Sequence, residues 1–305
     1  MRALVPTSNK NNMVTFAEVA EPEPADDEVV VEVEAFSINR GETFLLEAPR
    51  AGWRPGKDIA GRVLRAAANR TGPAAGTRVV GHPPARGWAQ RVAVPVAQLA
   101  RLSDEIDAAT GAALPLAGLT ALRLLRTIGS LPSRRILLTG AAGGVGHVFV
   151  ELASAAGADV TVVVATQERG QRLLELGASR VVLEIDRAPD GMDIVLESVG
   201  GASFTAALAR LAPRGTLIWF GQAGRTPATV DFFSFFGGRE SAMIRHFDYT
   251  DSDIADSVDL STLVQLVARG RLHPEIGSTS PWEETAERIA DLRARRIRGK
   301  AILHV

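Results

Sequence analysis

Residues 135–146 read Arg-Ile-Leu-Leu-Thr-Gly-Ala-Ala-Gly-Gly-Val-Gly, and helical spacing of apolar residues follows from Gly144 to Ala156. An apolar strand, a turn of small residues and a helix thus follow in order. Counted from Ala141, the turn is A-x-G-x-x-G, a variant of the fingerprint whose backbone N–H groups approach a pyrophosphate at a helix N-terminus. The stretch predicts a dinucleotide-binding unit, although a tight strand-to-helix turn without a ligand would look similar.

Strands and helices alternate beyond this stretch, which predicts a doubly wound parallel sheet with helices on both faces. The predicted strands are 135–139, 159–164, 180–183, 192–196 and 215–220, and the predicted helices are 144–156, 168–176 and 202–211. Before residue 107, frequent turn residues separate short β-rich segments, which is typical of a mostly antiparallel β domain. These segments are 29–35, 59–64, 77–80 and 89–94. Helices are also expected at 107–114, 120–128, 261–269 and 282–295, and a last strand at 300–305 is expected to rejoin the first domain.

Composition limits the partners of this chain. Its 305 residues correspond to about two domains. With 34 Lys and Arg against 35 Asp and Glu, it has no field that would attract nucleic acid or an anionic membrane. Cysteine is absent, which excludes disulfides, thiolate nucleophiles and zinc sites that need Cys. Because neither a signal segment nor a long apolar run is seen, we expect a cytoplasmic protein with a small-molecule partner.

The end of the second predicted strand bears on the choice of cofactor. Sites specific for NAD usually place an acid there for the ribose 2′-hydroxyl, but here Thr166 and Arg169 follow instead. A guanidinium fork suits a 2′-phosphate, so the sequence favours NADPH. NADH stays open, because Glu168 and Glu184 are nearby and Arg169 could equally be a solvated residue of a helix first turn.

Short motifs along nearly the whole chain resemble the medium-chain dehydrogenase/reductase superfamily, and within it the zinc-independent quinone oxidoreductase, or zeta-crystallin-like, branch. Besides the glycine turn, they are Ser37-Ile38-Asn39-Arg40-Gly41-Glu42, Pro55-Gly56-Lys57-Asp58-Ile59-Ala60-Gly61, Gly76-Thr77-Arg78-Val79-Val80-Gly81, Gly87-Trp88-Ala89-Gln90, Gly118-Leu119-Thr120-Ala121, Ser198-Val199-Gly200-Gly201 and Gly299-Lys300-Ala301. The resemblance implies a discontinuous GroES-like catalytic domain (1–110 and 258–305) and a Rossmann dinucleotide-binding domain (111–257). It also implies a cofactor held between the two domains, and a homodimer, since relatives commonly dimerise.

The resemblance further implies which residues bind the cofactor. Asn39 and Thr120 would be polar contacts near the nicotinamide that position the reactants, and Lys300 would reach the cofactor or the substrate. The remaining assignments are Ala142, Gly143, Gly144 and Val145 for the pyrophosphate, Thr166 and Arg169 for the 2′-phosphate, and Ser198, Val199, Gly200, Gly221, Gln222 and Ala223 for the ribose and nicotinamide.

Zinc-containing members of the superfamily bind their catalytic metal through Cys, His and a carboxylate. Here there is no Cys, His82 stands alone in the relevant loop, and Asp58, at the acidic position, is interpreted as structural. We therefore expect no metal. Without a Lewis acid the acceptor must itself stabilise the added hydride, as a quinone or an α,β-unsaturated carbonyl compound does.

One departure from the family pattern concerns the proton donor. Phe44 stands where related enoyl-thioester reductases and many quinone reductases have Tyr, and the single Tyr, Tyr249, is far from the motif. Arg40, Glu42 and Thr43 could substitute, but each is more readily structural. The sequence thus favours an NADPH-dependent quinone or enone reductase. The alternatives are an NADP(H)-binding sensor or partner-binding module with little turnover, and an enoyl-thioester reductase.

The loops around Phe44 and Phe233 are expected to form the acceptor pocket. Five Phe residues lie between positions 232 and 247. Such a cluster is also typical of a core or of a subunit interface.

Overall fold

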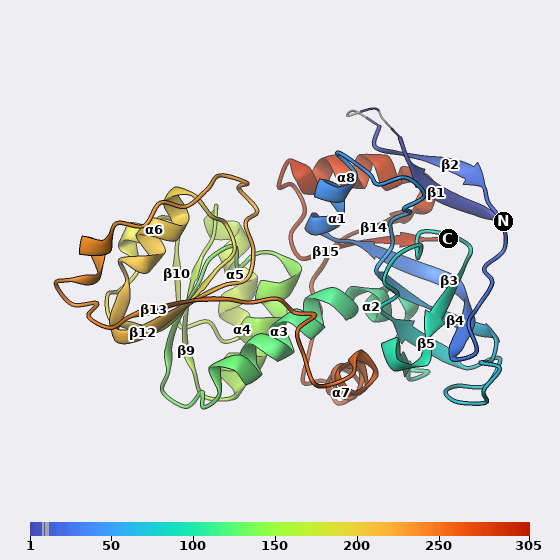
Figure 1. The fold of residues 1–305 in the computed structure, drawn as a ribbon. Coiled ribbons are helices and arrows are strands. Elements are labelled where there is room, and N and C mark those ends of the chain that lie inside the picture. Colours follow the sequence, from blue (N-terminus) through green and yellow to red (C-terminus); the bar gives the residue numbers. More distant parts are fainter. Residues whose placement is uncertain (8, 10–11) are drawn as a thin grey trace. The chain divides into compact units, whose positions relative to one another are not determined.

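The computed structural model describes residues 1–7, 9 and 12–305. The chain forms two compact units, Met1–Leu119 with Asp253–Val305 and Thr120–Ser252. Both chain ends belong to the first unit, as the blue and red segments of Figure 1 show.

The first unit is built on a seven-stranded sheet in the order β14-β15-β3-β4-β5-β7, with β6 also paired to β3. Its strands pair antiparallel except β14 and β15, which are parallel. A separate hairpin joins β1 (Arg2–Pro6) and β2 (Val14–Glu18). The sheet strands are β3 (Glu28–Ile38), β4 (Asp58–Arg65), β5 (Arg78–Gly81), β6 (Arg91–Pro95), β7 (Leu99–Arg101), β14 (Ile276–Pro281) and β15 (Lys300–His304).

Pairing of β15 with β3 is what brings the end of the chain to its beginning. Phe36 of β3 stacks on Trp88 within the apolar core of this unit, with ring centroids 5.5 Å apart. The helices of the unit are α1 (Arg40–Leu45), α2 (Ala108–Ala113), α7 (Asp256–Ala268) and α8 (Thr285–Arg293), with 3₁₀ turns η1 (Val96–Gln98) and η4 (Trp282–Glu284). Helix α3 (Pro115–Ile128) contains the boundary between the units.

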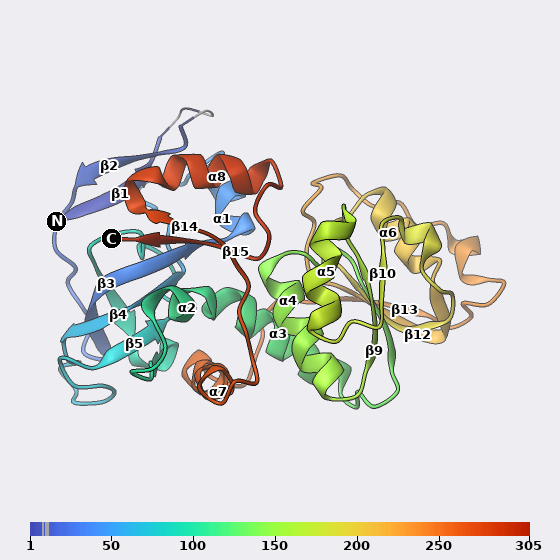
Figure 2. The ribbon, with the colours of Figure 1, turned by 180° about the vertical axis from the view of Figure 1, so that it is seen from behind.

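The second unit is a six-stranded parallel sheet in the order β10-β9-β8-β11-β12-β13. The chain runs outward from β8 to β10, then returns to β11 on the other side of β8, so the winding direction reverses between β8 and β11. Ligands of such sheets bind at this reversal, beyond the carboxyl ends of the strands. The elements, shown in Figures 1 and 2, are β8 (Arg135–Leu138), α4 (Gly144–Ala155), β9 (Asp159–Val163), α5 (Gln167–Glu175), β10 (Arg180–Val182), η2 (Ile185–Arg187), β11 (Met192–Glu197), α6 (Ala202–Leu208), β12 (Leu211–Trp219), η3 (Phe232–Phe235) and β13 (Met243–His246).

The predicted fold class is confirmed, while several boundaries were wrong. Helix α6 ends at Leu208, because Leu211 already belongs to β12. The segment predicted as a helix at 282–295 begins with a 3₁₀ turn and ends at Arg293. Strands β1, β2, β7, β13 and β14 and helix α1 were not predicted, since each is short and depends on its partners in the fold. Among the described helices, none has the length and apolar composition needed to cross a membrane.

The phenylalanine cluster is not a core. Phe232, Phe233 and Phe236 are 68%, 74% and 55% exposed and contact one another on the surface of the second unit. The core interpretation is therefore wrong for these three, and the interface interpretation stays a prediction.

Candidate active site

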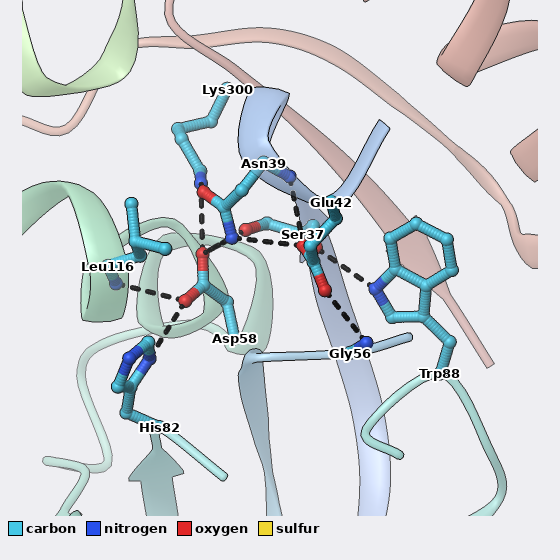
Figure 3. A network of polar contacts seen from close by, with 9 residues as sticks. All are labelled: Ser37, Asn39, Glu42, Gly56, Asp58, His82, Trp88, Leu116 and Lys300. Carbon is cyan, nitrogen blue, oxygen red and sulfur yellow. Dashed lines mark hydrogen bonds and ion pairs between the residues drawn. The ribbon is translucent and has the colours of Figure 1, made fainter. Parts of the chain in front are cut away.

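Asp58 is the centre of a buried polar network in the first unit (Figure 3). Its Oδ2 accepts hydrogen bonds from Ser37 Oγ at 2.7 Å, Asn39 Nδ2 at 2.8 Å and Lys300 Nζ at 2.9 Å. Its Oδ1 accepts from the backbone N–H of Leu116 at 2.9 Å and lies 3.3 Å from His82 Nδ1. The carboxylate is completely buried and contacted by five separate groups, which fixes its position.

Strand register explains how these distant residues meet. Ser37 pairs with Asp58 between β3 and β4, and Ala301 pairs with Ile38 between β15 and β3. The same register places Lys300, at the start of β15, beside Asn39, which follows β3. A residue at position 300 therefore completes a site that begins at position 37.

A second buried carboxylate, Glu42, lies in the first turn of α1. Its Oε2 accepts from the backbone N–H and the Nδ2 of Asn39 at 3.1 and 3.2 Å, and its Oε1 accepts from the N–H of Gly56 at 2.8 Å. Gly56 has φ of +118°, and a Cβ there would lie 2.2 Å from the backbone nitrogen of Trp88. Only glycine brings this N–H to Glu42.

The two carboxyl groups have opposite electrostatic environments. Burial raises the pKa of Glu42, and the charge of Asp58 raises it further, to about 7, although hydrogen bonds from Gly56 and Asn39 and the charge of Lys300 oppose the shift. Burial also acts to raise the pKa of Asp58, but Lys300, His82 and Ser37 together hold it well below its usual range. Near neutral pH, Asp58 is ionised while Glu42 is close to half protonated.

Asn39 is held on both sides of its amide. Nδ2 donates to both carboxylates, while Oδ1 accepts from Lys300 Nζ at 2.6 Å. Both N–H donors are used within the protein, so a further partner could reach only the second lone pair of Oδ1. Its predicted contact with the nicotinamide stays a prediction, and its donors are already used in organising the network.

Of the other proton-donor candidates in this unit, Arg40 donates from Nη2 to the carbonyl of Leu292 at 2.8 Å, and the Thr43 hydroxyl donates to the carbonyl of Arg40 at 2.7 Å. Both are engaged in holding α1. Phe44 is half-buried on the same helix.

In the second unit, the glycine turn leads directly from β8 into helix α4. Gly143 is the N-cap of α4, so the first N–H groups of that helix have no partner within it. A Cβ at Gly146 would lie 2.1 Å from the carbonyl oxygen of Ala141. Residue 146 must therefore be glycine for the helix to start this close to β8. The predicted cradle Ala142–Val145 lies at this N-terminus, beyond the carboxyl end of β8.

Glu197 organises the neighbouring turn and was not predicted as a site residue. This completely buried carboxylate, at the end of β11, accepts from the N–H groups of Val199 and Gly200 at 3.0 Å each and from Ser203 Oγ at 2.9 Å. It also accepts from Thr139 Oγ1 at 3.2 Å. An acid directly after an apolar strand and before Ser-Val-Gly is the signal that could have identified it.

The structure brings both predicted nicotinamide turns of this unit together. The N–H of Ala223 donates to the carbonyl of Ser198 at 2.8 Å, and a Cβ at Gly221 would lie 3.2 Å from the Cβ of Ser198. Gln222 Nε2 donates to the carbonyl of Thr226 at 3.1 Å. The two turns form one surface at the carboxyl edge of the sheet, where β11 and β12 end.

The other predicted residues lie elsewhere. Thr166 caps α5, its hydroxyl accepting from the N–H of Arg169 at 3.4 Å. Thr120 is buried within α3, and Phe233 is exposed on η3. Glu184, which raised doubt about a 2′-phosphate, is exposed and 4.0 Å from Arg187.

Comparison with known proteins is in agreement with this architecture. Residues 152–303 match the family model described as zinc-binding dehydrogenase. The chain is 27% identical over 263 residues to quinone oxidoreductase-like protein 2 of Bos taurus, covering 82% of this chain and 75% of the relative. It is 28% identical over 240 residues to 2-haloacrylate reductase of Burkholderia sp, covering 72% and 71%. A mycobacterial protein solved in complex with NADPH superposes with a TM-score of 0.90 at 24% identity, covering both chains completely.

One unit has a largely antiparallel sheet, and the other has a parallel sheet with a glycine turn. Together they define a medium-chain dehydrogenase/reductase. Within that class the chain belongs to the quinone oxidoreductase family and is an oxidoreductase.

Proposed function

We propose that this protein transfers hydride from NADPH to a quinone or an α,β-unsaturated carbonyl compound. The observation that carries the proposal is the glycine turn at the reversal of the parallel sheet, where Gly146 leaves no room for a Cβ and no side chain caps the N-terminus of α4 in the described structure. Helix N-termini of this kind bind phosphate groups. The names of two relatives support the acceptor class, one being a quinone oxidoreductase-like protein and the other a reductase of a 2-haloacrylate, an α,β-unsaturated acid.

When bound, the nicotinamide would supply the hydride, and an acceptor with its own electron sink would take it. The chain's residues would orient and shield the reactants. Ala142, Gly143, Gly144 and Val145 would hold the pyrophosphate, while Glu197 would keep the Ser198–Gly200 turn in shape for the ribose and nicotinamide. Lys300, held by Asp58 and Asn39, would place a positive charge near the acceptor.

We further propose that the reaction needs no zinc. Asp58, at the acidic position of the zinc-containing relatives, already faces the ammonium group of Lys300 at 2.9 Å and four other groups. A metal ion at that carboxylate would lie against this positive charge, so the residues here do not fit one. Among residues 1–7, 9 and 12–305, no group of three His, Asp or Glu side chains is placed to hold a metal.

The cofactor preference is testable at Arg169. If its guanidinium binds a 2′-phosphate, Arg169→Ala should weaken NADPH binding about tenfold or more and leave NADH unchanged, as lost charge-assisted hydrogen bonds would. Fluorescence titration with each cofactor measures this. Equal losses for both would contradict the assignment.

Stopped-flow mixing with NADPH and a panel of quinones and enones tests the activity itself. NADPH oxidation with at least one acceptor is expected. Tight NADPH binding with negligible turnover for every acceptor would instead support the sensor or partner-binding alternative. A marked preference for thioester-linked enones would support the enoyl-thioester reductase.

A homodimer is proposed through the exposed edge of the second unit. All four residues of β13 are exposed, and the strand lies at the end of its sheet. Three exposed Phe residues lie on the surface of the same unit. Exposed edge strands with apolar neighbours pair readily with another strand. Ile244→Lys should convert a dimer to a monomer in analytical ultracentrifugation; a monomeric wild type would contradict the proposal.

A further inference from the structure

Two arginines of the first unit, Arg54 and Arg86, come from loops that are joined by a backbone hydrogen bond. The Nη1 of Arg54 is buried and has no hydrogen-bond partner among the residues that the structure describes. Neither guanidinium forms an ion pair with any carboxylate in the described part of the chain. Burial lowers the pKa of Arg54, and the positive charge of Arg86 lowers it further.

Backbone hydrogen bonds hold the two loops together. The N–H of Arg86 donates to the carbonyl of Arg54 at 3.1 Å, and the N–H groups of Gly87 and Trp88 donate to Gly56 and Pro55 at 2.9 and 3.2 Å. Arg86 has φ of +72°, in the left-handed region that residues other than glycine rarely adopt. The two loops therefore maintain a costly arrangement, with a strained residue, a buried unpaired donor and adjacent like charges.

The pair lies next to the buried network. Gly56, whose N–H donates to Glu42, follows Arg54 by two residues, a separation of at most about 7 Å between Cα atoms. Asp58 follows two residues later on the same segment. A group bound by Arg54 and Arg86 would thus be held beside the elements that position Asn39 and Lys300.

We propose that Arg54 and Arg86 form a subsite for an oxyanion of the acceptor, so that the preferred substrate is an α,β-unsaturated carbonyl compound with a carboxylate or phosphate group. This inference rests on the proposed reductase function and narrows its substrate class. Two guanidinium forks bind such planar or tetrahedral oxyanions through paired hydrogen bonds. The oxyanion would satisfy the buried Nη1 and relieve the repulsion between the two cations.

Matched acceptors test the subsite. 4-Oxopent-2-enoate has a carboxylate where pent-3-en-2-one has a methyl group. The phosphate ester of 5-hydroxypent-3-en-2-one has a phosphate group at the same end. Wild type should have a lower KM for at least one charged acceptor, and whichever is preferred identifies the oxyanion. In Arg54→Gln and Arg86→Gln, that KM should rise about tenfold while the KM for the neutral enone is unchanged. Arg50→Gln, an exposed arginine of the same loop, is the control and should behave as wild type.

A binding measurement separates this inference from the function on which it rests. Inorganic phosphate should raise the thermal unfolding midpoint of wild type and Arg50→Gln but not of Arg54→Gln. If no acceptor is reduced, the proposed function fails and this measurement alone decides the subsite. The inference would be overturned if Arg54→Gln raised the KM for charged and neutral acceptors equally. It would also be overturned if phosphate raised the unfolding midpoint of all variants equally, or if phosphate inhibition were competitive with NADPH alone.

Discussion

Asp58 in the first unit and Glu197 in the second are both completely buried carboxylates, yet they are satisfied in different ways. Asp58 accepts from side chains far apart in sequence, including the ammonium group of Lys300, 242 positions away. Glu197 accepts mainly from its own turn, through Val199, Gly200 and Ser203, all within six positions. No cation takes part in the hydrogen bonds that the described structure gives Glu197.

The two carboxylates therefore stabilise different parts of the structure. An ion pair buried between distant strands joins the two ends of the chain, and it leaves an uncompensated charge if one partner is lost. A carboxylate satisfied by neutral local donors shapes a single turn, so its loss should affect that turn first.

Asp58→Asn should have the largest effect. It leaves Lys300 buried without its counter-charge, so the free energy of unfolding should fall by about 3–5 kcal/mol, as for other broken buried ion pairs. Urea unfolding followed by tryptophan fluorescence measures the loss.

A double-mutant cycle with Lys300→Met identifies the cause. The double variant should be destabilised by less than the sum of the single variants, because neither charge is then left alone. Additive losses would mean that Asp58 acts through Ser37 and Asn39 and not through the ion pair.

The second effect is a dependence of stability on pH. Because the pKa of Glu42 is raised to about 7 in the folded protein, the folded state binds more protons than the unfolded state between about pH 4.5 and 7. The stabilisation is complete below this window and is lost as the pH rises through it, by about 3 kcal/mol in all. Asp58 behaves oppositely: its lowered pKa stabilises the fold above the ordinary pKa of an aspartate, and this is lost only in stronger acid.

Unfolding curves between pH 5 and 8 test the sign of the effect of Glu42. Wild type should lose stability with rising pH, and Glu42→Gln should have a lower but flat profile. A flat wild-type profile, or a slope that persists in the variant, would show that Glu42 does not titrate in this range.

The same contrast explains which parts of the site could be predicted from sequence. Local patterns were sufficient for the glycine turn, because its strand, turn and helix are contiguous and the constraint at Gly146 lies within five residues of Ala141. They were not sufficient to predict that Gly56 donates to Glu42 or that Asn39 is hydrogen-bonded within the network. Both depend on β3, β4 and β15 meeting in one register. A buried unpaired atom such as Arg54 Nη1 exists only once the chain is folded. Glu197 is intermediate: its partners are mostly local, but its burial depends on the sheet.

The third effect should come from Glu197→Gln. The substitution retains one acceptor oxygen but loses the charge that receives the N–H groups of Val199 and Gly200. A loss of about 2 kcal/mol in the free energy of unfolding is expected, in the range of a hydrogen bond to a charged group.

Glu197→Gln should also lower the affinity for NADPH, because the Ser198–Gly200 turn is proposed to face the cofactor. Thr216→Ser, a change on the neighbouring strand β12, is the control and should leave the affinity unchanged. Weaker stability with unchanged affinity would mean that the turn lies outside the cofactor site.

The smallest effect should come from the cap of α5. Thr166 accepts from the N–H of Arg169 with a neutral hydroxyl, so Thr166→Ala should cost about 1 kcal/mol of stability, the usual value for a lost N-cap. Thr166→Ser keeps the hydroxyl and should restore both stability and NADPH affinity. If Thr166 serves only as a cap, the alanine variant should lose stability but bind NADPH and NADH in the wild-type ratio. If it also contacts the 2′-phosphate, the variant should lose NADPH affinity selectively, so titration with both cofactors separates a residue that shapes the helix from one that binds the ligand.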